Sequence, residues 1–261
     1  AVRGDRYRWL YDRDERSHTF LGVHRESGSV IGCGTVIPCR LHLGGDGALT
    51  AGIMSDLAVV PQHRTAGPAV KILRAVAKGG ADAGLGVLYG APNPKSEPIF
   101  KRIRFELVGR MKTFVKPLRS ERKMKKHIAS PPIAKAISRV VDGALRAYDW
   151  KQRLGDRRQY GEALTDVADE RYDALWEQTP APYITLAKTR QHLNWRYRDY
   201  PTGVYRFFEL TDPDTPDELW GWVAYTLIHD AVAVGDLPCA FGRDIDLLLY
   251  AFSACMRRQG H

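Results

Sequence analysis

The sequence predicts an α/β (α+β) protein built from two domains of the same kind. In the first half, short apolar runs bounded by turn residues alternate with segments of helical periodicity, an order that is typical of layered α/β folds. In the second half, three patterns of the first half return in the same order at an offset of roughly 180–190 residues, which argues for two copies of one domain. These two observations predict the fold class and the domain count.

The first half of the sequence is expected to form strands, a loop and one main helix. Residues 19–38 contain two strand-like runs joined by a turn at 26–29. A third apolar run, 57–60, leads through a proline-containing loop into residues 68–83, whose apolar residues fall at helical spacing. Residues 84–93 form an apolar run that a proline ends, and therefore predict a buried strand.

A change of composition separates the two halves. Residues 116–132 are basic and end in a double proline, which predicts a linker, and residues 133–154 predict one amphipathic helix. The apolar positions of that helix keep a three-four spacing: Ile133, Ile137, Val140, Val141, Leu145 and Tyr148. The expected parts are a first domain over 1–118, a basic linker and helix over 119–154, and a second domain over 155–261.

The two expected copies differ at one loop. The paired segments are 7–12 with 193–201, 31–38 with 219–228, and 55–60 with 234–240. Where the first copy has the loop that starts at Pro61, the second has the run PCAFGRDIDLLLY, and the sequence stops in the helix that follows. The second copy is therefore expected to be degenerate or truncated and to lack the loop.

The composition limits the class of protein. Apolar residues make up 44% and charged residues 26% of the chain, as in globular domains. No run approaches the roughly 20 apolar residues of a membrane span, and residues 1–9 are too polar for a signal peptide. The four cysteines form no CxxC pair and no metal-ligand spacing, so we expect reduced thiols, no metal and a cytoplasmic location. Because residue 1 is not Met, we expect a trimmed chain or a piece of a longer one.

The net charge of +9 indicates an anionic partner. Nucleic acid is one candidate, and a phosphorylated cofactor or a nucleotide-linked substrate is another; the charge alone does not separate them. Five basic side chains gather in the expected linker: Arg119, Arg122, Lys123, Lys125 and Lys126. They are interpreted as a solvated linker, with an anionic membrane surface or a nucleic acid as the functional alternatives. Nucleic acid is not favoured, because no aromatic side chains interleave with them for base stacking.

Aromatic side chains gather instead in residues 193–208. They alternate with arginines as in a half-buried strand: Trp195, Tyr197, Tyr200, Tyr205, Phe207 and Phe208. Core packing is the first interpretation of this cluster. Lining an acceptor cleft between the two copies is the alternative.

The segment SDLAVVPQHRTAGPA (55–69) carries most of the functional information. It predicts a strand that leads through a tight loop of small residues into a helix N-terminus, where free amides and the helix dipole favour an anion. The glycine fingerprint of dinucleotide folds and the Walker lysine are both missing. What remains is a spacing formed by Arg64, Gly67 and Ala69. The alternative is an ordinary proline-started helix after a strand.

This spacing resembles the acyl-CoA loop of the GNAT superfamily of N-acetyltransferases. Residues 87–114 are similar to the next strand, the Asn-led helix and the final strands of that superfamily, with Asn93, Ser96 and Phe105 at the matching positions. Residues 27–38 resemble its central hairpin strand, so the resemblance covers about residues 7–118. It implies, for each copy, a GNAT-like mixed central sheet flanked by helices.

The resemblance also implies a binding site for acetyl-CoA or another acyl-CoA as co-substrate. The loop amides would hold the CoA pyrophosphate, and the strand before the loop would present backbone groups to pantetheine. The residues assigned to the cofactor are Leu57, Ala58, Val59, Arg64, Thr65, Ala66, Gly67, Ala69, Asn93 and Phe100. For the strand residues, an ordinary central strand is the compatible simpler interpretation.

The catalytic assignments are Asp56 and Tyr89. Asp56 is the carboxylate nearest the loop and the candidate base; a strand-end cap or a salt bridge is its alternative role, and a water chain could carry the proton instead. The superfamily often has a Tyr, as thiolate acid, where this chain has Phe100, and a phenyl ring cannot donate a proton. Either Tyr89 takes that role, or the thiolate is solvated, or this copy binds CoA without turning it over.

The two-copy pattern resembles the tandem-GNAT sugar N-acyltransferases of cell-surface polysaccharide synthesis. This resemblance implies an N-acyltransferase that moves an acyl group from acyl-CoA to a small amine, such as a nucleotide-linked amino sugar. Attack on the thioester would be direct, because no Cys or Ser stands in an evident nucleophile setting. The alternatives are a tRNA-dependent aminoacyl transferase and a non-catalytic CoA-binding module of the same fold.

Overall fold

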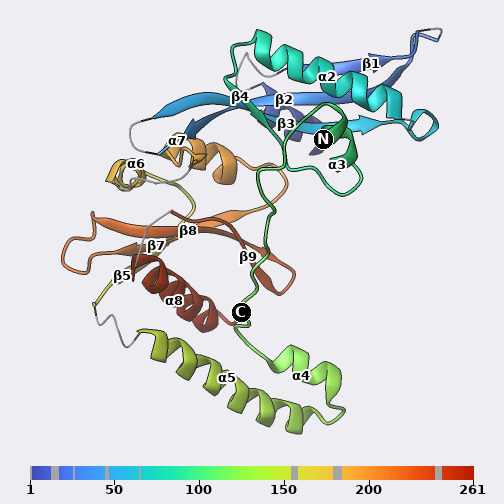
Figure 1. Ribbon diagram of the computed structural model, residues 1–261. Coiled ribbons are helices and arrows are strands. Elements are labelled where there is room, and N and C mark those ends of the chain that lie inside the picture. The colour runs from blue at the N-terminus through green and yellow to red at the C-terminus, as the bar shows by residue number, and fades with distance from the viewer. Residues whose placement is uncertain are drawn as a thin grey trace. The chain divides into compact units, whose positions relative to one another are not determined.

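The structure of the chain is a computed structural model that describes residues 2–12, 18–25, 27–44, 47–64, 66–153, 158–178, 184–238 and 243–261. The chain divides into two compact units (Figure 1). Unit 1 contains residues 1–111 and 181–187, and unit 2 contains residues 112–180 and 188–261. The segment 119–154, expected as a linker with a helix, therefore belongs to unit 2.

Unit 1 contains a sheet with helices. Its helices are α1 (Val2–Tyr11), the 3-10 turn η1 (Pro61–His63), α2 (Ala66–Asp82) and α3 (Glu97–Arg102). Its strands are β1 (His18–Val23), β2 (Val30–His42), β3 (Ala48–Val59), β4 (Val87–Tyr89) and the short β6 (Thr185–Leu186). The hairpin, the loop-bearing strand and the main helix thus form where the sequence predicts them.

The sheet of unit 1 is mixed, as predicted. Its strand order is β1-β2-β3-β4, and β6 pairs with the end of β2. The neighbouring pairs are antiparallel except β3 with β4, which run parallel over three residues of each strand. A parallel pair needs a crossover connection, and here that connection is α2.

Helix α2 covers one face of this sheet (Figure 1). Its side chains Ile72 and Val76 are buried, and they lie against glycines in β1 and β2. A Cβ on Gly34 would come within 2.9 Å of Ile72 Cγ2 and 3.1 Å of Val76 Cγ2. The glycine therefore permits the close approach of the helix to the sheet, and Val36 and Met54 complete the buried core beneath it.

The final strands expected within residues 87–114 are absent beyond β4. Residues 103–120 contain no strand, and apolar side chains such as Val108, Met111 and Phe114 are exposed there. The chain turns at Arg104, which has φ +68°, directly after α3. These residues pair with no strand among the described residues, so no further strand of unit 1 forms there.

Unit 2 contains a second sheet with helices on both faces. Its helices are α4 (Glu121–His127), α5 (Pro131–Arg153), α6 (Glu170–Gln178), α7 (Arg190–Leu193), the π-helical turn η2 (Asn194–Arg198) and α8 (Arg243–Arg258). Its strands are β5 (Gly161–Thr165), β7 (Tyr205–Thr211), β8 (Leu219–Ile228) and β9 (Ala231–Asp236).

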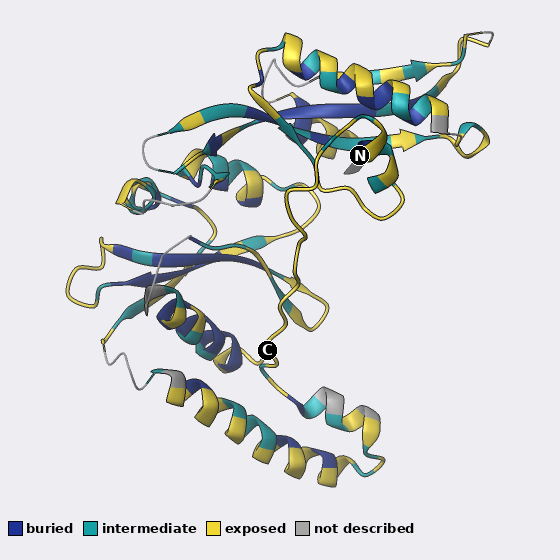
Figure 2. Ribbon diagram, viewed as in Figure 1, coloured by how far each residue is buried: buried dark blue, intermediate teal, exposed yellow. Residues whose placement is uncertain are grey.

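The sheet of unit 2 has the order β5-β7-β8-β9, and all its pairs are antiparallel. A mixed sheet was expected in both units; in unit 2 no described strand follows α8 to form the parallel pair that β4 forms in unit 1. Phe208 and Tyr225 face the core under α8, whereas Phe207 and Trp222 face the core with α6 and η2. Figure 2 colours most residues of β7 and β8 as buried. The aromatic cluster of the sequence is therefore largely core, as its first interpretation predicts.

The two units share an order of elements. Unit 1 has a helix, three antiparallel strands and a helix in α1, β1, β2, β3 and α2, and unit 2 has the same order in α7 with η2, β7, β8, β9 and α8. Residues 239–242, where the second copy should lack the loop, lie outside the described residues. Among the helices of the described part, none is long and apolar enough to cross a membrane.

Candidate functional site

Strand β3 is interrupted by a bulge at Asp56. Thr35 of β2 pairs with Ser55 and Cys33 pairs with Ala58, so the two residues Asp56 and Leu57 lie opposite Gly34 alone. Asp56 has φ +48°, a left-handed conformation that is uncommon for a residue other than glycine. Bulges of this kind redirect a strand and are frequent next to functional sites.

The strands β3 and β4 separate near the bulge. Strand β4 pairs only with Ala51–Ile53, whereas β3 continues to Val59 with β2 on its other side. In the described part of the chain, the β3 residues 54–59 therefore have no strand on their second edge. This open edge contains the three residues assigned to pantetheine: Leu57, Ala58 and Val59. Leu57 and Val59 pack side chains on the core beneath α2, and Ala58 is exposed.

The loop after β3 delivers the chain directly to the first turn of α2. Arg64 does not extend freely from this loop, because its Nε donates a 2.9 Å hydrogen bond to the carbonyl oxygen of Val59. Gly67 is exposed in the first turn of α2, and Ala69 is buried against the sheet. A short loop therefore joins the open edge of β3 to the first turn of a 17-residue helix, whose amides have no intrahelical acceptor. Thr65 and the side chain of Ala66 lie outside the described residues.

The carboxylate of Asp56 is held by α1. Arg6 Nη1 lies 3.1 Å from Asp56 Oδ2, and the Tyr11 hydroxyl donates a short hydrogen bond to the same oxygen. Tyr11 also lies 3.2 Å from Thr35 Oγ1, so its phenol bridges β2 and β3. Neither Arg6 nor Tyr11 was predicted as a site residue. The only sequence signal near them is the aromatic pattern of residues 7–12, which indicated the repeat.

These contacts set the protonation of the cluster. Burial raises the pKa of Asp56, but hydrogen bonds from Arg6 and Tyr11 outweigh burial, and the net pKa lies below the ordinary value. Burial is also the largest cause that raises the pKa of Tyr11, and the bond to Asp56 adds to it. At neutral pH the pair is therefore a carboxylate and a neutral phenol. A carboxylate with a lowered pKa is a weak general base.

Tyr89 lies away from this cluster, on the same face of the sheet. Its hydroxyl is 3.6 Å from the thiol of Cys39, and its ring is half-buried. Side chains alternate along β2, so Cys39 shares a face with Thr35, opposite the core residue Val36. Burial, followed by the contact with Cys39, raises the pKa of Tyr89 above that of a free phenol. The phenol therefore stays protonated and is a hydrogen-bond donor.

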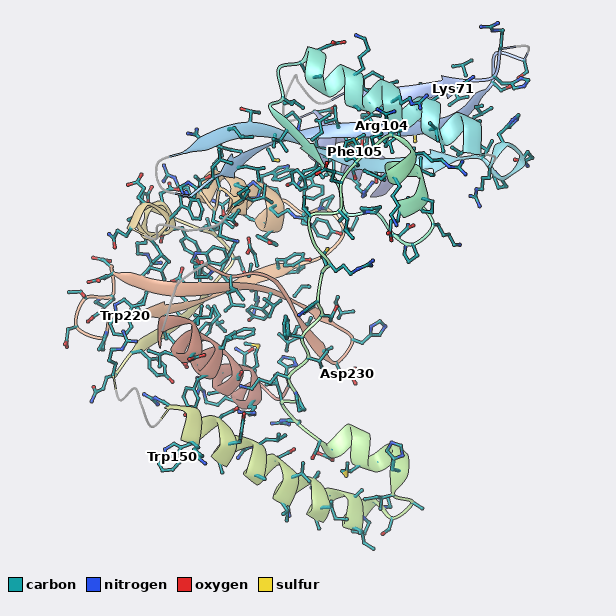
Figure 3. The ribbon with its side chains drawn as sticks, viewed as in Figure 1. Lys71, Arg104, Phe105, Trp150, Trp220 and Asp230 are labelled. Atoms are coloured by element: carbon teal, nitrogen blue, oxygen red, sulfur yellow. The ribbon has the colours of Figure 1, made fainter. Side chains whose placement is uncertain are left out.

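Two residues assigned to the cofactor have structural partners. Phe100 is buried in the core of unit 1 and packs edge-to-face on Phe105, with 5.5 Å between ring centroids; Figure 3 labels Phe105 just after α3. Asn93 Oδ1 accepts hydrogen bonds from the backbone amides of Lys95 and Ser96, both at 3.0 Å. Both side chains thus shape the segment around α3. Cofactor contact by either residue stays a prediction.

Comparisons with known proteins give a structural likeness without a sequence family. No family model matches the chain, and no curated protein matches it either. A solved protein of Enterococcus faecalis, described as a conserved protein of unknown function and probable N-acyltransferase, is 12% identical with a TM-score of 0.61, and the match covers 98% of this chain. This likeness shows the fold. The chain spans 55% of the length of that protein.

Shorter matches cover about two fifths of the chain. A Trypanosoma brucei acetyltransferase is 18% identical over 43% of this chain and 75% of its own, with a TM-score of 0.34. A glucosamine-6-phosphate N-acetyltransferase from Arabidopsis thaliana is 12% identical over 43% of this chain and 76% of its own, with a TM-score of 0.36. These scores are too low to support an argument about this chain. Among the described residues, no group of three or more His, Cys, Asp or Glu side chains could hold a metal ion.

Proposed function

We propose that this chain binds an acyl-CoA in unit 1 and transfers the acyl group to an amine. The observation that carries the proposal is the open edge of β3 at residues 54–59, which a short loop joins to the first turn of α2. An extended ligand with amides at one end and phosphates at the other matches these two features. The likeness in fold to a probable N-acyltransferase supports the same class of reaction.

The cofactor would be held mainly by backbone groups. The amides of the pantetheine arm would pair with the open edge of β3 as an added strand does, near Leu57–Val59. The pyrophosphate would lie at the start of α2, where the amides near Gly67 and the helix dipole favour a negative charge. The guanidinium of Arg64 lies at the end of β3 and would add a charge-assisted contact to a phosphate.

The chemistry would be a direct attack of the amine on the thioester. The new C–N bond forms as the C–S bond breaks, and the proton that the amine loses ends on the sulfur of CoA. Because the pKa of Asp56 is lowered, its carboxylate holds a proton poorly, and water would carry the proton away from the amine. Asp56 then serves to attract and orient the amine rather than to remove its proton.

The leaving thiolate would be stabilised by a donor on the same face. Tyr89 is a protonated phenol near the end of β4, and Tyr11 is a second protonated phenol beside the bulge. Both have raised pKa values, so hydrogen-bond donation to the sulfur fits them better than complete proton transfer. Phe100, buried in the core, would take no part in this step.

A more specific proposal concerns the type of enzyme, the amine acceptor and the cellular location. The shared order of elements in the two units supports a tandem-GNAT enzyme, and a small amine such as a nucleotide-linked amino sugar is the acceptor that we propose. The thiols of Cys33, Cys39 and Cys255 are unpaired by disulfides, which fits the proposed cytoplasmic location. An aminoacyl transferase that takes its acyl group from tRNA would leave the loop at Arg64–Ala69 without a role.

Thermal unfolding in the presence of acetyl-CoA, free CoA and tRNA, each added separately, tests the proposal. A ligand that binds the native state raises its stability by mass action, so acetyl-CoA and CoA should raise the midpoint and tRNA should not. Release of CoA thiol with candidate amino sugars then separates an enzyme from a binding module. If tRNA alone stabilises the chain, or if acetyl-CoA at about 1 mM leaves the midpoint unchanged, the proposal fails.

A further inference from the structure

Helix α5 exposes a continuous apolar stripe. The stripe consists of Ile133, Ile137, Val140, Ala144 and Tyr148, which fall on one side of the helix at three-four spacing. Val140 is 74% exposed and Tyr148 is 62% exposed. Figure 2 shows the exposed bands that this arrangement produces along α5. Four of the six apolar positions expected from the sequence lie in this stripe and face solvent, whereas the other two, Val141 and Leu145, are half-buried.

Polar contacts on the other side of α5 fix this orientation. Asp149 is buried, and it pairs with Arg257 of α8 at 2.6 Å and with Lys116 at 3.0 Å. Ser138 is buried as well, and its carbonyl oxygen accepts a hydrogen bond from Ser120. Rotating α5 to bury the stripe would expose or break these contacts, and a buried charge that loses its partner is costly. The stripe is therefore held outward by the rest of unit 2.

The net positive charge of the whole protein comes from the segment of the sequence that contains this stripe. Residues 112–153 contain twelve Lys and Arg and three Asp and Glu, an excess of nine positive charges. This excess equals the net charge of the chain, because the other 219 residues contain 27 residues of each sign. The basic character therefore belongs to α4, α5 and their flanks rather than to the acyl-CoA site.

On α5, three exposed basic side chains form a basic flank on a different side of the helix from the stripe. Lys135, Arg139 and Arg146 are exposed and lie on one side of the helix, between the buried face and the apolar stripe. Trp150, labelled in Figure 3 near the end of α5, is 59% exposed and falls between these basic residues and the stripe. An apolar face with Trp toward its border and basic residues on the polar side is the pattern of helices that lie in the surface of a membrane.

We propose that α4 and α5 dock unit 2 on an anionic membrane surface. The stripe would enter the boundary between headgroups and acyl chains, and the basic flank would contact anionic headgroups. The charge excess would also suit a nucleic acid, but a nucleic acid offers nothing to bury Ile133, Ile137 and Val140. The surface would bring the acyltransferase unit close to an acceptor carried on, or released at, a membrane. The docking surface itself does not depend on the acyl-transfer proposal.

Flotation of the full chain with phosphatidylcholine vesicles, with and without phosphatidylserine, tests this surface. We expect binding to the anionic vesicles alone, and weaker binding as salt rises from about 0.1 M to 0.5 M. The variant Val140→Glu should abolish binding. Neutralising the flank with Lys135→Gln, Arg139→Gln and Arg146→Gln together should weaken it about 100-fold, because each basic residue near such a surface contributes about fivefold. Val204→Glu, an equally exposed change in unit 2 outside α5, is the matched control and should bind as the parent does.

Three results would overturn the proposal. The first is no flotation of the parent chain with anionic vesicles at the lower salt. The second is loss of binding in the basic variant with full binding in Val140→Glu, which would indicate a polyanion such as nucleic acid. The third is a parent chain that sediments as a dimer and a Val140→Glu variant that sediments as a monomer, which would show that a second copy covers the stripe.

Discussion

The phenol of Tyr11 donates a hydrogen bond to the carboxylate of Asp56, although 45 residues separate them in sequence. This bond ties the C-terminal end of α1 to the bulge of β3, the place where β3 and β4 part. Helix α1 therefore lies over the sheet face opposite α2, and it brings Arg6 to the same carboxylate. The site is thus shaped from both faces of the sheet. The helix N-terminus lies on one side, and an ionised, hydrogen-bonded cluster lies on the other.

Removing the Tyr11 hydroxyl should loosen the bulge. The change Tyr11→Phe keeps the ring but deletes a donor to a charged group, so we expect the free energy of unfolding to fall by about 1.5–3 kcal/mol. Urea denaturation at neutral pH measures the change. Tyr7→Phe is the matched control on the same helix, because the Tyr7 ring packs on Tyr11 but its side chain is exposed. Equal effects of the two changes would contradict the role of the Tyr11 hydroxyl.

The lowered pKa of Asp56 predicts a pH dependence of stability. A carboxyl group whose pKa is lower in the folded state stabilises the fold above its unfolded pKa, near 3.9, and loses that contribution as pH falls through the folded pKa. The change Asp56→Asn removes the ionisable group but keeps a residue that tolerates positive φ. We therefore expect the difference in unfolding free energy between parent and variant to be largest near neutral pH.

Urea midpoints from about pH 7 to pH 2.5 measure that difference and should show it shrinking below about pH 4. Asp82→Asn changes an exposed carboxylate on α2 and serves as the control. It should alter stability by less than about 0.5 kcal/mol. A difference for Asp56→Asn that stays constant across the whole pH range would show that its carboxylate is not stabilised in the fold.

Local patterns in the sequence predicted the elements but not the way they meet. The helix expected at 68–83 forms at Ala66–Asp82, and the helix expected at 133–154 forms at Pro131–Arg153, because their periodicity and punctuation are local. The final strands expected within residues 87–114 do not form beyond β4, since a strand needs a partner that its own sequence does not specify. For the same reason, no local sequence pattern indicates that Tyr11 pairs with Asp56.

The candidate site could likewise be predicted only in part. The loop at Arg64–Ala69 and the strand before it could be identified because their spacing is short and uninterrupted. The bulge at Asp56 could not, because it depends on the pairing register between β2 and β3. Phe100 was assigned to the cofactor by its position in a pattern, but packing against Phe105 and the core decides where its ring lies. Helix α5 could be predicted as amphipathic, but tertiary contacts such as the buried pair Asp149–Arg257 determine which way it faces.

Phe100, in the core of unit 1, should matter far more for stability than the exposed Phe114. The change Phe100→Ala removes a buried ring and should lower the unfolding free energy by about 3–5 kcal/mol. Phe114→Ala removes a ring that is 88% exposed and should change it by less than about 0.5 kcal/mol. Denaturant unfolding of both variants measures this contrast. If Phe100→Ala instead changes stability only mildly and greatly lowers the affinity for CoA, Phe100 contacts the cofactor.

A negative charge in the first turn of α2 should separate binding from stability. Gly67 is exposed there, so Gly67→Asp would place a carboxylate where the proposed pyrophosphate lies. Because an acidic residue near a helix N-terminus interacts favourably with the dipole, the variant should be as stable as the parent or more stable by up to about 1 kcal/mol. Its affinity for CoA should nevertheless fall by about tenfold or more, since the two negative groups compete for the same amides.

Ala75→Asp, exposed farther along the same helix, is the matched control and should leave CoA affinity unchanged. Calorimetric titration with CoA and thermal unfolding without ligand measure the two effects separately. Unchanged affinity in Gly67→Asp would place the phosphates elsewhere, whereas equal losses of affinity in both variants would indicate a general effect of charge.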